Sequence, residues 1–164
     1  MICFKYVFLG VLKMKSKWDR RFLELAGLIS TWSKDLSTKT GAVVIGPDRE
    51  IRATGYNGLC RGVNDDIPER QERPTKYDFF EHAERNAIYN ACLTGTSLKG
   101  CTMYCTHTPC TDCARGIIQA GIKRVVTNKP DFTGAPVGTW RDKVAFSQQM
   151  FQEAGVEYVE LDKE

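Results

Sequence analysis

Four residues in two short stretches have the types and spacing of a metal centre with an acid–base group beside it. His82 and Glu84 lie two positions apart, and Cys110 and Cys113 form a C-x-x-C directly after Pro109. Imidazoles and thiolates are zinc ligands, and three protein ligands leave the fourth position of a tetrahedral ion open to water. The pattern therefore predicts a catalytic zinc held by His82, Cys110 and Cys113.

Glu84 is predicted to move protons rather than to bind the metal. Zinc lowers the pKa of water to roughly 7–9, so a carboxylate beside the ion can take the water proton. Glu84 would pass it to a ring nitrogen and then to departing ammonia. The backbone N–H of Ala83 would start a helix and be available to a substrate oxygen. H-x-E followed by P-C-x-x-C is the signature of zinc-dependent nucleobase deaminases.

Two other interpretations of the cysteine pair stay open. His107, three residues before Cys110, could complete a structural zinc site, but His82 and Glu84 would then have no role. A redox C-x-x-C would not need His82 either. The chain has seven cysteines, and an odd number argues against a disulfide-stapled secreted protein.

The elements that must position these residues alternate between helices and strands. Apolar residues at helical spacing predict a helix over 17–34 with Trp32 on its core face. A turn between two apolar runs predicts a β-hairpin over 42–56, and a long polar loop follows over 58–79. Helices are predicted at 82–94, 109–120 and 142–154, and strands at 102–106, 123–127 and 156–161. Such alternation favours an α/β sheet with covered faces.

Composition and charge narrow the class of protein. The 164 residues, 42% of them hydrophobic and 26% charged, suit one globular domain. Residues 1–13 are expected to be a leader or loose arm ahead of a single catalytic domain over 14–164. Their apolar run is too short for a signal peptide or a membrane span, so a cytoplasmic location is expected. The net charge of +3 is too even for a nucleic-acid polymer as partner.

Further motifs resemble the deoxycytidylate (dCMP) deaminase family over about residues 16 to 130. They are Gly55-Tyr56-Asn57-Gly58, His82-Ala83-Glu84 with Asn86-Ala87-Ile88, and Pro109-Cys110-x-x-Cys113-Ala114. The resemblance implies a three-layer α/β/α sandwich around a five-stranded mixed sheet. It also implies conversion of dCMP to dUMP for thymidylate synthesis, contact between Asn57 and the substrate sugar, and a homo-oligomer, with a hexamer favoured.

Nucleotide regulation is a further implication of the resemblance. Family members bind dCTP with Mg²⁺ as an activator and dTTP as an inhibitor in the loop that here contains Gly58, Gly62, Asn64, Asp65 and Asp66. Cys60 stands where a proline is common. Candidate cations for the substrate phosphate are Arg61, Arg70, Arg73, Lys76 and Arg115.

Two rival functions remain. One is a deaminase of another substrate: dCTP, a modified dCMP, or a base within RNA. RNA would require a basic groove with stacking aromatics, which the even charge disfavours. The other is a non-catalytic, zinc-binding deaminase-like fold. Glu84 argues against that hypothesis because a purely structural site has no use for the carboxylate.

Overall fold

A five-stranded mixed sheet forms the centre of the protein. The computed structural model describes residues 17–133 and 140–162, so the predicted leader over 1–13 lies outside the described residues. The strand order is β2 (Ile51–Tyr56), β1 (Gly41–Ile45), β5 (Thr102–Cys105), β6 (Arg124–Asn128) and β7 (Glu157–Leu161). β1 is antiparallel to β2 and β5, whereas β5, β6 and β7 are parallel. The mixed sheet expected from the resemblance is confirmed.

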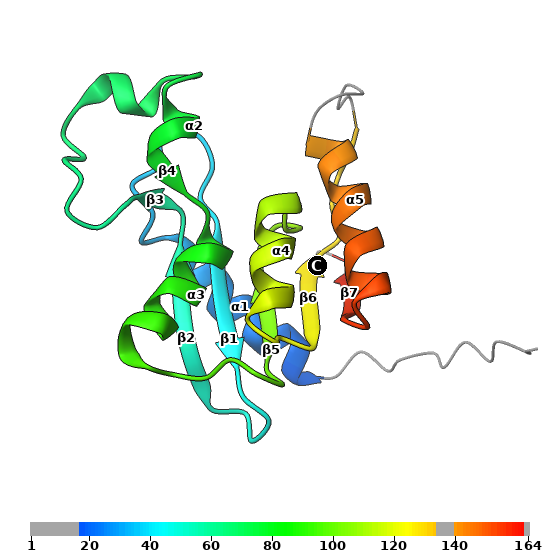
Figure 1. The fold of residues 1–164 in the computed structure, drawn as a ribbon. Helices are drawn as coiled ribbons and strands as arrows, with labels where there is room; N and C mark the ends of the chain where they lie inside the picture. The colour runs from blue at the N-terminus through cyan, green and yellow to red at the C-terminus, as the bar shows by residue number, and fades with distance from the viewer. Residues whose placement is uncertain (1–16, 134–139, 163–164) are drawn as a thin grey trace, which may run out of the picture.

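Helices cover both faces of this sheet (Figure 1). α1 (Lys17–Ser30) lies on one face, and α3 (Ala83–Thr94), α4 (Thr111–Gln119) and α5 (Trp140–Glu153) lie on the other. Alternation along β1 explains the two layers, since Val43 and Ile45 pack with α1 while Ala42 and Val44 face the opposite cluster. The α/β/α sandwich is therefore confirmed.

The first helix is shorter than its apolar spacing predicted. α1 ends at Ser30, and Thr31, Trp32 and Ser33 form turns in which each backbone N–H bonds the carbonyl three residues earlier. Trp32 was predicted to lie on the core face, but its side chain is 57% exposed and meets Tyr56 edge-on. The prediction was wrong because Trp32 lies beyond the last residue of the helix. Its side chain therefore does not continue the roughly 3.6-residue spacing of the buried helix face.

The helix that carries the cysteine pair starts later than predicted. The sequence predicted Pro109 as its first residue, but α4 begins at Thr111 and Cys110 is its extended N-cap residue, with φ −75° and ψ 174°. Cys113 is then the third residue of the helix. The two cysteines therefore flank the first helical turn, which places both sulfurs at its N-terminal end.

The segment predicted as a polar loop contains short elements. β3 (Gly58–Leu59) pairs with β4 (Phe80–Glu81), and a 3₁₀ turn (Pro68–Gln71) and α2 (Lys76–Phe79) lie between them. Elements of two to four residues are too short to produce a hydrophobic period, so the sequence did not predict them. Within the described ranges, none of the helices has the length and apolar character needed to cross a bilayer.

Candidate active site

His82, Cys110 and Cys113 come together where the N-terminal ends of α3 and α4 converge. His82 Nδ1 lies 3.4 Å from the Sγ of each cysteine. With bonds of about 2.3 Å to sulfur and 2.0 Å to nitrogen, a tetrahedral zinc separates such ligand atoms by roughly 3.5 Å. The three side chains fit that ion. Among the described residues they are the group of histidines, cysteines and acids close enough to share a metal.

The backbone around β2 determines where His82 lies. His82 is the N-cap residue of α3, and this helix packs closely on β2 because Gly55 has no side chain. A Cβ at Gly55 would lie 2.3 Å from the carbonyl oxygen of Ala83. Asn86 donates a hydrogen bond from Nδ2 to the carbonyl oxygen of Tyr56 at 2.7 Å. The two motifs that carry the family resemblance therefore hold each other in place.

The charge state of the sulfurs also suits a cation. Hydrogen bonds from Cys113 and His82 lower the pKa of Cys110 to about 3 in spite of its burial. The contact with Cys110, together with burial, raises the pKa of Cys113. The hydrogen bond to Cys110 raises the pKa of His82 against the effect of burial. The surroundings of Cys110 therefore favour the thiolate form that binds a metal, and a bound cation would favour loss of the proton from the second sulfur.

Glu84 lies beside this group but is not part of it. It is the second residue of α3, its side chain is buried, and burial raises the pKa of its carboxyl while the charge on His82 opposes the rise. Ala83 is the first residue of the helix, so its N–H has no acceptor within α3. A carboxyl with a raised pKa next to a metal group can both take and return a proton near neutral pH.

The metal group opens into a cleft of about 900 Å³. Asn57, Ala83 and Glu84 line it, as do His82 and Cys110. Its size is ample for a mononucleotide, because small-molecule sites commonly enclose about 300–1,000 Å³. His107 also lines the cleft, where its Nδ1 lies 3.2 Å from Thr106 Oγ1. The structure therefore brings His82, and not His107, to the cysteines.

Most of the candidate phosphate cations already have hydrogen-bond or ion-pair partners within the protein. Lys76 contacts Asp35 and Arg115 contacts Asp112 on the surface of α4. Arg61 bonds Asn90 and Arg70 bonds the carbonyl oxygen of Asn64. Arg73 lines the cleft, with its guanidinium over the ring of Tyr77.

Lys143 and Asp35 are among the cleft residues that sequence reasoning missed. Lys143 is one of several polar residues on α5, a helix that carries no motif. Asp35 precedes the hairpin in a segment without a recognised pattern. Among the described residues, no carboxylate pairs with Arg73 or Lys143, so both present positive charge to the cleft.

The predicted regulatory loop lies outside the lining of this cleft. Asp65 pairs with Lys34, and the N–H of Asp66 donates to Asn64 Oδ1 at 2.9 Å. Gly62 has φ 81°, in the left-handed region where glycine is favoured. Gly58 starts β3 and pairs with Glu81, one residue before His82. The loop is therefore connected by backbone pairing to the metal group.

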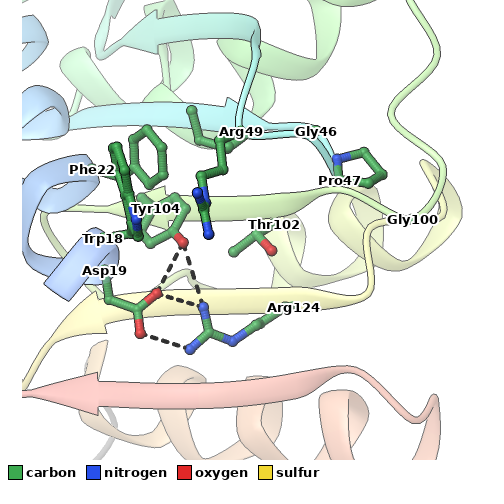
Figure 2. Close-up of a pocket in the computed structure, with 11 residues that line it drawn as sticks. Trp18, Asp19, Phe22, Gly46, Pro47, Arg49, Gly100, Thr102, Tyr104 and Arg124 are labelled. Atoms are coloured by element: carbon green, nitrogen blue, oxygen red, sulfur yellow. Dashed lines mark hydrogen bonds and ion pairs between the residues drawn. The ribbon is translucent and has the colours of Figure 1, made fainter. Parts of the chain in front are cut away.

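A smaller pocket of about 240 Å³ lies at the other end of the sheet, beside the start of β5 and β6. Figure 2 shows the carboxylate of Asp19 facing the guanidinium of Arg124 and the hydroxyl of Tyr104. Arg124 donates to Asp19 at 2.7 and 2.9 Å, and the Tyr104 hydroxyl donates to it at 2.9 Å. These polar groups stabilise one another, and among the described residues no histidine or cysteine lines the pocket.

Comparison with known proteins agrees with this geometry. Residues 16–129 match the family model for the cytidine and deoxycytidylate deaminase zinc-binding region. The chain is 44% identical to an uncharacterised deaminase in the luxG 3′ region of Aliivibrio fischeri, over 88% of this chain and 93% of that protein. It is 35% identical to human deoxycytidylate deaminase, over 87% of this chain and 78% of the human one.

A solved structure shows the same likeness. The dCMP deaminase of cyanophage S-TIM5, in complex with dCMP and dUMP, superimposes with a TM-score of 0.72 at 28% identity. The match covers 90% of this chain and 99% of the phage protein. Fold, metal group and sequence all agree, and this chain belongs to the cytidine and deoxycytidylate deaminases, a family of zinc-binding enzymes.

Proposed function

We propose that this protein hydrolyses dCMP to dUMP and ammonia. The observation that carries the proposal is one cleft lined by His82, Cys110, Glu84 and Asn57 together with two cations that pair with no carboxylate in the part of the chain that the structure describes. The names of the human relative and of the cyanophage enzyme, which was solved with dCMP and dUMP, support the same substrate. The product would feed thymidylate synthesis.

The zinc, Glu84 and the backbone N–H of Ala83 each have a separate role in the proposed reaction. Zinc, when bound, supplies the Lewis acidity that makes water nucleophilic near neutral pH. Glu84 takes a proton from the water that adds to C4 of cytosine and delivers it to N3. It then takes the proton of the new C4 hydroxyl and delivers it to the amine, which leaves as ammonia while the C4 carbonyl forms. The N–H of Ala83 donates to the O2 atom of the base, which fixes the ring over the metal group.

Arg73 and Lys143 are the proposed partners of the 5′-phosphate. Both line the cleft, from distant parts of the chain. They replace Arg115 in this proposal because the guanidinium of Arg115 is already paired with the carboxylate of Asp112. Charge-assisted hydrogen bonds to a phosphate are among the stronger polar contacts in proteins. They would favour a nucleotide over a nucleoside.

Regulation and assembly are part of the same proposal. The loop with Gly58, Gly62, Asn64, Asp65 and Asp66 would bind dCTP with Mg²⁺ as an activator and dTTP as an inhibitor, in a homo-oligomer, with a hexamer favoured. The supporting observation is that β3 joins this loop to the strand directly before His82. A nucleotide on the loop could therefore act on the metal group through the backbone.

The decisive experiment is an ammonia-release assay with the zinc-loaded protein on dCMP, dCTP, cytidine and tRNA. Turnover concentrated on dCMP is expected, with kcat/KM for cytidine lower by about 100-fold or more because cytidine lacks the phosphate and its two contacts and carries an additional 2′-hydroxyl. Equal turnover of dCTP would assign the protein to a different nucleotide. Zinc binding without turnover of any substrate would support the non-catalytic hypothesis.

A further inference from the structure

The side-chain amide of Asn57 is almost completely used by the protein itself. Its Nδ2 donates to Asp35 Oδ2 and to the carbonyl oxygen of Thr38, both at 2.8 Å. Its Oδ1 accepts a hydrogen bond from the backbone N–H of Thr40 at 2.7 Å. A primary amide has two N–H donors and two acceptor lone pairs. One lone pair on Oδ1 therefore remains, and Asn57 can meet a ligand only as an acceptor.

Asp35 is the group that prevents the opposite orientation of this amide. A flip of Asn57 would turn Oδ1 toward the Asp35 carboxylate and the Thr38 carbonyl, neither of which can donate. Asp35 is 2% exposed, and its Oδ1 accepts from the N–H groups of Ser37 and Thr38 at 2.8 and 3.0 Å. Burial would raise the pKa of Asp35, but the hydrogen bonds from Lys76, Thr38 and Ser37 lower it on balance.

The ammonium group of Lys76 offsets the cost of burying the Asp35 carboxylate. Its Nζ lies 2.5 Å from Asp35 Oδ1 and 2.6 Å from Ser37 Oγ, and the residue is 7% exposed. A buried charge without a partner is costly, so loss of either member would allow the other to move or attract water. Lys76 is the first residue of α2, so this ion pair also connects α2 to Asp35 in the lining of the cleft.

We propose that Asp35 and Lys76 are positioning residues that hold Asn57 as a pure hydrogen-bond acceptor and thereby make the cleft select a substrate hydroxyl. The inference rests on the proposed function, because dCMP has one free sugar hydroxyl, at C3′. That hydroxyl can donate to the remaining lone pair of Asn57 Oδ1. A substrate without it would leave a buried acceptor unsatisfied.

The test compares kcat/KM for dCMP and for 2′,3′-dideoxycytidine 5′-monophosphate, which differs only at C3′. The zinc-loaded wild type should prefer dCMP by about 10- to 100-fold. Lys76→Gln and Asp35→Asn should lose most of that preference, mainly through a higher KM for dCMP, while Lys76→Arg should retain it. The matched control is Lys34→Gln, which breaks the exposed Lys34–Asp65 pair and should leave the preference unchanged.

The outcomes separate the inference from the function on which it rests. If the wild type does not turn over dCMP, the proposed function fails. If it turns over both nucleotides equally well, Asn57 does not select the hydroxyl. If the variants lose activity on both nucleotides by the same factor, Asp35 and Lys76 serve only folding. If Asp35→Asn does not fold, the contrast between Lys76→Gln and Lys76→Arg still tests the positioning role, and equal preferences in these two variants would overturn it.

Discussion

His82 Nδ1 lies 3.4 Å from the Sγ of Cys113, a residue 31 positions later in the chain. The contact exists because the N-terminal ends of α3 and α4 converge above the same face of the sheet. Gly116 on α4 faces α3, and a Cβ there would lie 3.4 Å from Ile88 Cδ1, at ordinary contact distance. The metal centre therefore depends on the packing of two helices as much as on its ligands.

Removal of one sulfur should abolish zinc binding. Cys113→Ser is expected to reduce bound zinc from about one ion per chain to less than about a tenth, because three protein ligands are the minimum of a catalytic site. Zinc content after dialysis measures this. His107→Asn is the control, and it should keep its zinc; a loss of zinc in this variant would move the site to the other histidine.

Replacement of the carboxyl beside the metal group should separate binding from chemistry. Glu84→Gln is nearly isosteric, so it should keep zinc and dCMP binding while kcat falls by about 10²- to 10⁴-fold, the usual contribution of a general acid–base group. Stopped assays and zinc analysis of the same sample measure both quantities. Glu81→Gln, a cleft variant that breaks the pair with Arg85, should have a much smaller effect.

Lys143 and Arg73 should increase the affinity of the cleft for the phosphate of dCMP. Lys143→Met and Arg73→Met are each expected to raise the KM for dCMP by about tenfold, because each removes one charged contact with the phosphate, while activity on cytidine stays unchanged. Steady-state kinetics on both substrates provide the measurement. Arg115→Met is the matched control, and a similar rise in KM there would restore Arg115 as a phosphate ligand.

The close approach of β2 and α3 should make Gly55 intolerant of a side chain. Gly55→Ala would place a methyl group against the backbone of Ala83, so a loss of about 1–3 kcal/mol in the free energy of unfolding is expected. Gly27→Ala is the control, because its Cβ would meet nothing within 4 Å on α1, and a gain of about 0.5–1 kcal/mol is expected. Urea denaturation of both variants tests the pair.

Acid should remove the contribution of Asp35 to stability. Because folding lowers its pKa below the ordinary value of 3.8, the ionised form stabilises the native state above that pH. The contribution is lost as the pH falls through the lowered folded-state pKa. The stability difference between wild type and Asp35→Asn should therefore be constant from pH 7 to about pH 5 and shrink below about pH 4. A constant difference down to pH 2 would contradict a lowered pKa.

Much of the fold followed from local patterns. The hairpin over β1 and β2, the helix after His82 and its end at Gly95 were predicted from apolar spacing and glycine positions, and the structure has them. The predictions failed where an element was short, or where a helix began or ended at a different residue than the apolar spacing indicated. Trp32 lies beyond the end of α1, and the first helical residue after Pro109 is Thr111.

The sequence alone determined the type of chemistry, because His82, Glu84 and the two cysteines are adjacent or nearly adjacent within two short motifs. Tertiary structure decided which cations line the cleft and which are paired with a carboxylate. Lys76, four positions from β4, turns inward to Asp35, and Lys143 reaches the cleft from α5. Local spacing carries no information on such pairings, because they join residues tens of positions apart and depend on how helices and loops pack around the sheet.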